Sequence, residues 1–97
     1  MSPEQIEIAY DAGEVPAGFI HAFDFNSKAS ALIDSWLNAT GLGRWAGAEA
    51  RQNPETGRIE VSTKFMSDDG ERAEALIRAA VDGTPFASWK SLVRHVS

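Results

Sequence analysis

The stretch from Phe19 to Leu42 is the sequence feature that most constrains the fold. In its second half, apolar residues follow the i, i+3, i+4, i+7, i+8 spacing of one helical stripe: Ala29, Leu32, Ile33, Trp36 and Leu37. Asn26-Ser27 supplies an N-cap before the stripe, and Gly41 suits the left-handed position that ends a helix. Leu42 would then make the apolar contact that closes a Schellman motif. The pattern therefore predicts an amphipathic helix with its apolar face on a core.

The first half of this stretch has a different period. Residues 19–25 alternate, with Phe19, His21, Phe23 and Phe25 on one side. Residues 6–10 alternate in the same way, with Ile6, Ile8 and Tyr10 on one side. Alternation of this kind is typical of half-buried strands. We therefore expect two strands that pair as a wide hairpin, with the phenylalanines on the core face.

A second strand–strand–helix unit follows. Residues 44–52 and 59–65 alternate on either side of Asn53-Pro54-Glu55-Thr56-Gly57, a turn sequence that predicts a local hairpin. Asp68 with Glu71 has the spacing of a capping box, which predicts a second helix that ends near Gly83. Its apolar stripe consists of Ala73, Leu76, Ile77, Ala80 and Val81.

The segment after Thr84-Pro85 has two interpretations. Phe86, Trp89, Leu92, Val93 and Val96 fit helical spacing, with Pro85 at the first helical position, and we favour this helix. A strand here would instead give the last strand of a ferredoxin-like fold. Residues 1–97 are therefore expected to form one α+β domain. We predict a two-layer sandwich in which an antiparallel sheet of about four strands carries two helices on one face, in the order ββαββα plus the tail.

Composition excludes several classes of function. The chain has 97 residues, a net charge of −5 and no cysteine, so disulfides and thiolate metal sites are excluded. We see no secretory signal and no apolar run of membrane-spanning length, and we expect a cytoplasmic protein. The acidic balance disfavours general nucleic-acid binding and suits a basic protein partner. No sequence motif indicates a cofactor, a metal or a nucleophile, so we expect a protein that is not an enzyme.

His21 is the polar residue whose predicted position is most unusual. It lies among phenylalanines on a strand face that should be core. One interpretation places it in an apolar pocket as a base or a ligand, in a small ligand-binding or enzymatic domain. The other treats it as a structural histidine in the core or at the sheet edge.

Trp45 has three interpretations. If Ala46, Ala48 and Ala50 face the helices, alternation puts Trp45 on the open face of the sheet beside Glu49, Arg51, Arg58, Glu60 and Lys64. There it could anchor a protein interface, because Trp and Arg dominate interface hot spots. It could also stack on a base, as in sheets that bind RNA or single strands. In the opposite register it belongs to the core.

One set of short segments resembles a known family. Phe23-Asp24, then Ser35-Trp36-Leu37, then Gly41-Leu42-Gly43-Arg44 follow an order similar to that in small phage anti-CRISPR proteins, which inhibit type I surveillance complexes. The likeness covers about a fifth of the chain, with a shorter spacing before the glycine turn and no match in the strands. It implies a small inhibitor from a phage or mobile element and assigns a role to no residue.

Together these observations favour a small, acidic protein-binding module, with Trp45 and its charged neighbours as the candidate interface. Homodimerisation through an exposed strand edge is compatible with all of these interpretations.

Overall fold

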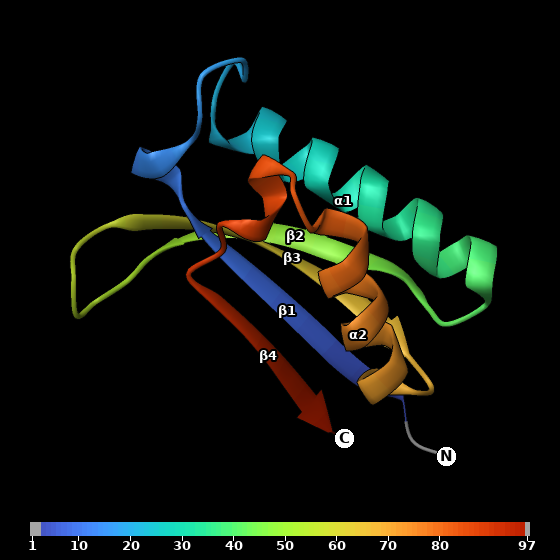
Figure 1. Ribbon diagram of the computed structural model, residues 1–97. Coiled ribbons are helices and arrows are strands. Elements are labelled where there is room, and N and C mark those ends of the chain that lie inside the picture. Colours follow the sequence, from blue (N-terminus) through green and yellow to red (C-terminus); the bar gives the residue numbers. More distant parts are fainter. Residues whose placement is uncertain (1–2, 97) are drawn as a thin grey trace.

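The computed structural model describes residues 3–96 and has the element order β-α-β-β-α-β (Figure 1). Each long element is bounded as follows: β1 (Glu4–Asp11), α1 (Ala22–Thr40), β2 (Arg44–Gln52), β3 (Ile59–Ser67), α2 (Gly70–Val81) and β4 (Ser91–Val96). Two 3₁₀ turns, η1 (Ala12–Glu14) and η2 (Pro85–Ala87), follow β1 and α2.

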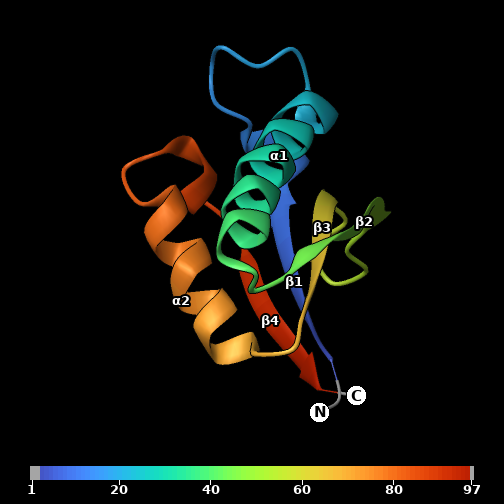
Figure 2. The same cartoon turned by 90° about the vertical axis from the view of Figure 1, so that its right-hand side faces the viewer.

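The four strands form one antiparallel sheet in the order β2-β3-β1-β4. Both helices lie on the same face of this sheet, and the other face is open (Figure 2). This arrangement confirms the predicted two-layer α+β sandwich. The element order and strand order are those of a ferredoxin-like fold, which was the alternative interpretation of the sequence.

The core lies between the helices and the two central strands. Strands β1 and β3 turn one row of side chains toward the helices, and both helices turn an apolar stripe toward the sheet. The side chains buried in this layer are Ile6, Ile8, Tyr10, Phe25, Ala29, Ile33, Leu37, Val61, Phe65, Ala73, Ile77 and Val81.

The strand predicted over residues 19–25 is wrong. Helix α1 begins at Ala22, and His21 is its N-cap, with Nδ1 accepting a hydrogen bond of 3.1 Å from the backbone N–H of Asp24. The helical spacing in fact starts earlier than Ala29, since Ala22, Phe25 and Ala29 lie at i, i+3 and i+7 on one stripe. Phe25 is buried, whereas Phe23 is 60% exposed, so the phenylalanines do not share a face.

The predicted hairpin between residues 6–10 and 19–25 is therefore absent. Strand β1 pairs instead with β3 on one side and β4 on the other. The predicted cap at Asn26-Ser27 is also wrong, because these residues lie inside α1. The other end of the helix is as predicted: Gly41 has φ of 70°, and Leu42 N–H donates to Leu37 C=O at 3.0 Å as in a Schellman motif.

The helix favoured for the C-terminal segment is wrong. Thr84 and Pro85 start only the short turn η2, and residues 91–96 form strand β4. Leu92 lies opposite Ile8 in the β1–β4 ladder. Because β1 is central, its backbone groups need partners on both sides, and this requirement outweighs the helical spacing of the tail.

Helix α2 starts one residue later than the capping-box pattern predicts. Asp69, and not Asp68, is the N-cap, and its Oδ1 accepts from the backbone N–H of Arg72 at 3.2 Å. The carboxylate of Glu4 accepts from Gly70 N–H at 2.7 Å, which ties the start of α2 to the start of β1.

Candidate protein-binding surface beside Trp45

A β-bulge in β2 determines where Trp45 points. Trp45 lies opposite Phe65, and Gly47 lies opposite Lys64, so the register shifts between these two pairs and Ala46 has no opposite residue. One extra residue reverses the alternation of side chains along a strand. Trp45 therefore faces the helix side of the sheet together with Ala48 and Ala50. The expectation that it would lie on the opposite side from these alanines is wrong.

Trp45 is held in place at two points. Its indole Nε1–H donates a hydrogen bond of 3.0 Å to Oγ1 of Thr63, a fully buried residue of β3. Oγ1 of Thr63 is in turn hydrogen-bonded to Oγ of Ser30 in α1 at 2.7 Å. The backbone N–H of Trp45 donates to Oδ1 of Asp34 at 2.7 Å. The ring remains 46% exposed, so it is fixed in orientation but accessible.

A small groove runs between Trp45 and α1. We call it the Trp45 groove, and its lining residues are Ser27, Ser30, Ala31, Asp34 and Trp45. It has a volume of about 210 Å³. The α1 residues that line it, other than Asp34, have small side chains: Ser27, Ser30 and Ala31. Solvent in the groove therefore lies close to the hydrogen bond between Thr63 and Ser30.

Apolar and small side chains continue beyond the groove. Phe23 is four residues before Ser27 on the same helical stripe and is 60% exposed. Ala48 and Ala50 are exposed on the helix side of β2, and Ile59 at the start of β3 is 49% exposed. Strand β2 lies at the edge of the sheet, beyond the cover of α1 (Figure 2). The result is an accessible apolar strip along one side of the molecule.

The charged residues grouped with Trp45 in the sequence lie on the other face of the sheet. Glu49, Arg51, Glu60 and Lys64 alternate with Ala48, Ala50, Val61 and Thr63, so they point away from the helices. Lys64 pairs with Glu49 at 3.2 Å, and Arg51 lies 3.9 Å from Glu7. The structure thus separates Trp45 from the charges and neutralises several of them within the chain.

Arg58 and Glu60 tie the β2–β3 turn to its surroundings. The Arg58 guanidinium forms an ion pair with Asp11, whose side chain is buried. The hydrogen bond that the guanidinium donates in this pair lowers the pKa of the Asp11 carboxyl below its ordinary value. Asn53 Nδ2 donates to Oε2 of Glu60 at 3.1 Å. Both residues therefore have structural partners within the chain.

His21 does not lie in the apolar core or pocket predicted for it. It is exposed at the N-terminal end of α1, and its ring is an edge-on neighbour of Phe23 with centroids 6.1 Å apart. Its Nδ1 accepts a hydrogen bond from the helix backbone, so the unprotonated nitrogen has a capping role. An exposed cap accounts for this residue without a pocket or a catalytic role.

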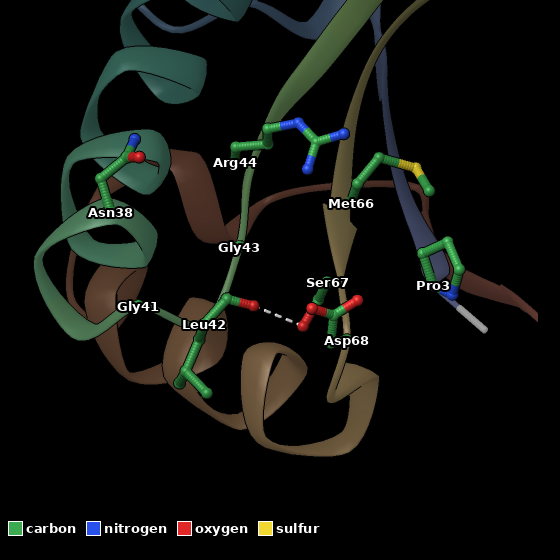
Figure 3. A pocket seen from close by; sticks show the side chains of 9 residues that line it. All are labelled: Pro3, Asn38, Gly41, Leu42, Gly43, Arg44, Met66, Ser67 and Asp68. Carbon is green, nitrogen blue, oxygen red and sulfur yellow. Dashed lines mark hydrogen bonds between the residues drawn. The ribbon is translucent and has the colours of Figure 1, made fainter. Parts of the chain in front are cut away.

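A second, more polar pocket lies where α1 ends and β2 begins (Figure 3). It has a volume of about 260 Å³ and is lined by Pro3, Asn38, Gly41, Leu42, Gly43, Arg44, Met66, Ser67 and Asp68. A hydrogen bond from Ser67 Oγ to the carbonyl of Leu42 joins its two sides. The Gly41–Arg44 turn follows a helix, whereas turns that bind phosphate precede one, so the loop lacks the backbone geometry of an anion site.

Residues 3–96 contain neither a cluster of metal-ligating side chains nor a helix that could span a membrane. Within this range no three His, Asp, Glu or Cys side chains come together in a way that could hold a metal ion. No helix in the same range is both long enough and apolar enough to cross a bilayer.

No protein-family model matches the chain, and a search of curated proteins finds no match.

Proposed function

We propose that this chain is a non-enzymatic protein-binding module that uses the Trp45 groove as its interface. The observation that carries the proposal is the half-exposed indole of Trp45, held at both its ring nitrogen and its backbone nitrogen. A large aromatic side chain that is already fixed loses little conformational entropy on binding, and tryptophan is enriched at interface hot spots.

The surroundings of Trp45 support a protein partner over a nucleic acid. The strip beside it is apolar or small: Phe23, Ala31, Ala48, Ala50 and Ile59. Nucleic-acid platforms combine aromatic rings with cations on one surface. Here Arg51 and Lys64 are on the opposite face of the sheet and are paired with acids. The net charge of −5 favours a partner with a basic rim around an apolar contact.

The test compares three immobilised proteins: the wild type, Trp45→Ala and Trp36→Ala. Trp36 is a matched control, because it is 48% exposed against 46% for Trp45. It is nine positions from Ser27, which places it about 180° around α1 from the groove. We expect a partner from lysate of the cell of origin to be retained by the wild type and by Trp36→Ala.

Trp45→Ala should lose that partner. Loss of a hot-spot side chain costs about 2 kcal/mol or more, which weakens binding by roughly 30-fold. Circular dichroism should show that all three proteins are folded. Retention of the same proteins by all three would contradict the proposal, as would a partner lost only with Trp36→Ala.

The narrowest form of the proposal is inhibition of a type I CRISPR surveillance complex. It is supported by the segment resemblance around Phe23, Trp36 and Gly41, and by the small size of the chain. Its test is the plating of a targeted phage on bacteria with an active type I system. Expression of the wild type should restore plaques, and Trp45→Ala should not. Unchanged immunity in the presence of the wild type would rule out this form and leave the general one standing.

A further inference from the structure

Residues 48–52 of β2 form a stretch of strand without irregularities, bounded by an interruption at each end. The bulge at Trp45/Gly47 interrupts the strand on one side, and the turn that begins at Asn53 ends it on the other. Residues 48–52 lie between these interruptions, and Ala50 is their midpoint. Within residues 3–96, strand β2 pairs only with β3, so this segment has one edge that no other described strand covers.

The direction of the backbone groups along this segment follows from the hairpin. Asn53 N–H donates to Arg58 C=O at 2.8 Å, which continues the register in which Gln52 lies opposite Ile59. In an antiparallel ladder, alternate residues turn their N–H and C=O groups toward the same neighbour. Residues 49 and 51 therefore direct these groups toward β3. Ala48, Ala50 and Gln52 direct theirs outward, toward solvent.

We infer that two copies of this chain pair through residues 48–52 of β2, antiparallel and with Ala50 on the two-fold axis. Ala50 then lies opposite Ala50 of the second copy, and Ala48 lies opposite its Gln52. Each copy donates one backbone hydrogen bond from each of its three outward-directed residues. The two small alanines leave no bulky side chain in the way of close approach.

The charges of β2 select this register. With Ala50 on the axis, Glu49 lies opposite Arg51 of the second copy, and Arg51 lies opposite its Glu49. Opposite charges in directly facing positions stabilise a strand pair, and like charges destabilise it. A shift of the axis to Glu49 or to Arg51 would instead place two like charges face to face. A shift to Ala48 would run the pairing into the bulge.

The other edge of the sheet does not offer the same complementarity. Strand β4 has the sequence Ser-Leu-Val-Arg-His-Val, which contains a cationic residue but no acid. Arg94 is already in contact with Glu74 at 3.3 Å and with Glu4 at 3.9 Å. Self-pairing of β4 would therefore gain no cross-strand ion pair, which is why the inference concerns β2.

The proposed dimer has a consequence for the Trp45 groove. A two-fold axis perpendicular to the sheet keeps the helices of both copies on the same side. Two four-stranded sheets then form one continuous sheet, and both Trp45 grooves flank a shared floor that contains Ala48 and Ala50 from each copy. This goes beyond the proposed function, because the pairing requires no other protein.

A charge-swap series tests the register by sedimentation equilibrium of the purified chain alone. Glu49→Arg and Arg51→Glu each place like charges face to face in both cross-strand pairs. We expect each to weaken dimerisation by at least about tenfold relative to the wild type. The double variant restores opposite charges across the axis and should regain the dimer.

The double variant also distinguishes an effect on dimerisation from an effect on the stability of the single chain. Glu49→Arg removes the contact of Glu49 with Lys64, and Arg51→Glu removes the contact of Arg51 with Glu7. The double variant loses both contacts, so the fold itself gains nothing from the second swap. A monomeric wild type at millimolar concentration would overturn the inference. Single variants that dimerise as well as the wild type would also overturn it.

A cysteine variant tests the position of the axis independently. The chain has no cysteine, so Ala50→Cys introduces a single thiol. Hydrogen-bonded residues that face each other in an antiparallel pair have Cα atoms about 5.5 Å apart, within the range that a disulfide spans. Ala50→Cys should therefore form a disulfide-linked dimer on mild oxidation. Ser35→Cys, exposed on α1, is the control, and equal cross-linking of both variants would contradict the inference.

Discussion

The indole Nε1–H of Trp45 donates a hydrogen bond of 3.0 Å to Oγ1 of Thr63, a residue with no exposed surface. This bond links an accessible aromatic ring on an edge strand to the centre of the core. Thr63 is also bonded to Ser30, so the same hydroxyl joins both layers of the sandwich. The orientation of the candidate interface residue is thus determined by buried polar groups.

Thr63→Val should destabilise the protein and loosen Trp45. Valine has nearly the same shape as threonine but offers no oxygen, so the Trp45 indole N–H loses its acceptor. Because this hydrogen bond is only partly buried, its loss should cost the usual net value of about 0.5–1.5 kcal/mol. We expect a fall of this size in the free energy of unfolding, measured by urea denaturation. Ser35→Ala is the control and should change stability little, because Ser35 is exposed on α1. Equal stability of Thr63→Val and the wild type would show that the bond contributes nothing.

Gly43→Ala should destabilise the protein more than Gly70→Ala. A Cβ atom at position 43 would lie 2.4 Å from the backbone oxygen of Met66. At position 70 it would lie 2.5 Å from the carboxylate of Glu4, which is the end of a flexible side chain and can move. Relief at Gly43 requires a shift of β3 itself, and overpacking of this kind costs about 1–3 kcal/mol. Thermal melts of the two variants measure the difference, and a larger loss for Gly70→Ala would contradict this reason.

Asp11 should contribute to stability above pH 4 and lose that contribution in acid. The hydrogen bond and charge of Arg58 lower the pKa of the folded-state carboxyl below its ordinary value. The unfolded chain therefore binds a proton first as pH falls, and folding becomes less favourable from about the unfolded pKa down through the folded one. Asp11→Asn should flatten the dependence of unfolding free energy on pH in this acidic range. An unchanged slope below pH 4 would show that Asp11 is not the group responsible.

Tyr10 should resist ionisation until the protein unfolds. Its hydroxyl donates to the carbonyl of Phe86 at 2.8 Å, and burial raises the pKa of the phenol well above its ordinary value. The contribution of this group to stability is complete below the unfolded pKa and declines as pH rises above it. The chain has one tyrosine, so its phenolate absorbance can be followed alone. That absorbance should appear together with unfolding, and in urea it should appear near the ordinary pKa. Ionisation near pH 10 in the folded protein would contradict the burial of Tyr10.

The architecture could be predicted from sequence because its main elements follow simple periods. The helix across residues 29–37, the glycine at 41 and the hairpin across residues 44–65 appear as expected. Trp36 is the exception in the predicted buried stripe, because it is 48% exposed. The strand predicted over residues 19–25 and the helix predicted over residues 86–96 are both wrong. Their spacing fits both helix and strand, and the choice is made by long-range pairing with β1, which a local pattern does not contain.

The candidate site was only partly predictable. Trp45 was identified as a candidate interface residue, but its charged neighbours in sequence lie on the other face because of the bulge. The signal for that bulge was Gly47, a glycine inside a strand pattern, which adopts φ of 142°. Ser27, Ala31 and Asp34 were missed, because small and polar residues on the flank of a helix are indistinguishable from an ordinary solvated face until β2 is placed beside them.

The most direct test of the central claim is the NMR spectrum of the three tryptophan indole N–H groups during titration with the protein partner that the capture experiment recovers. If the Trp45 groove is the interface, the indole signal of Trp45 should shift or broaden as binding saturates. The signal of Trp36, on the opposite side of α1, should stay in place. A Trp45 signal that remains unchanged through saturation would contradict the account.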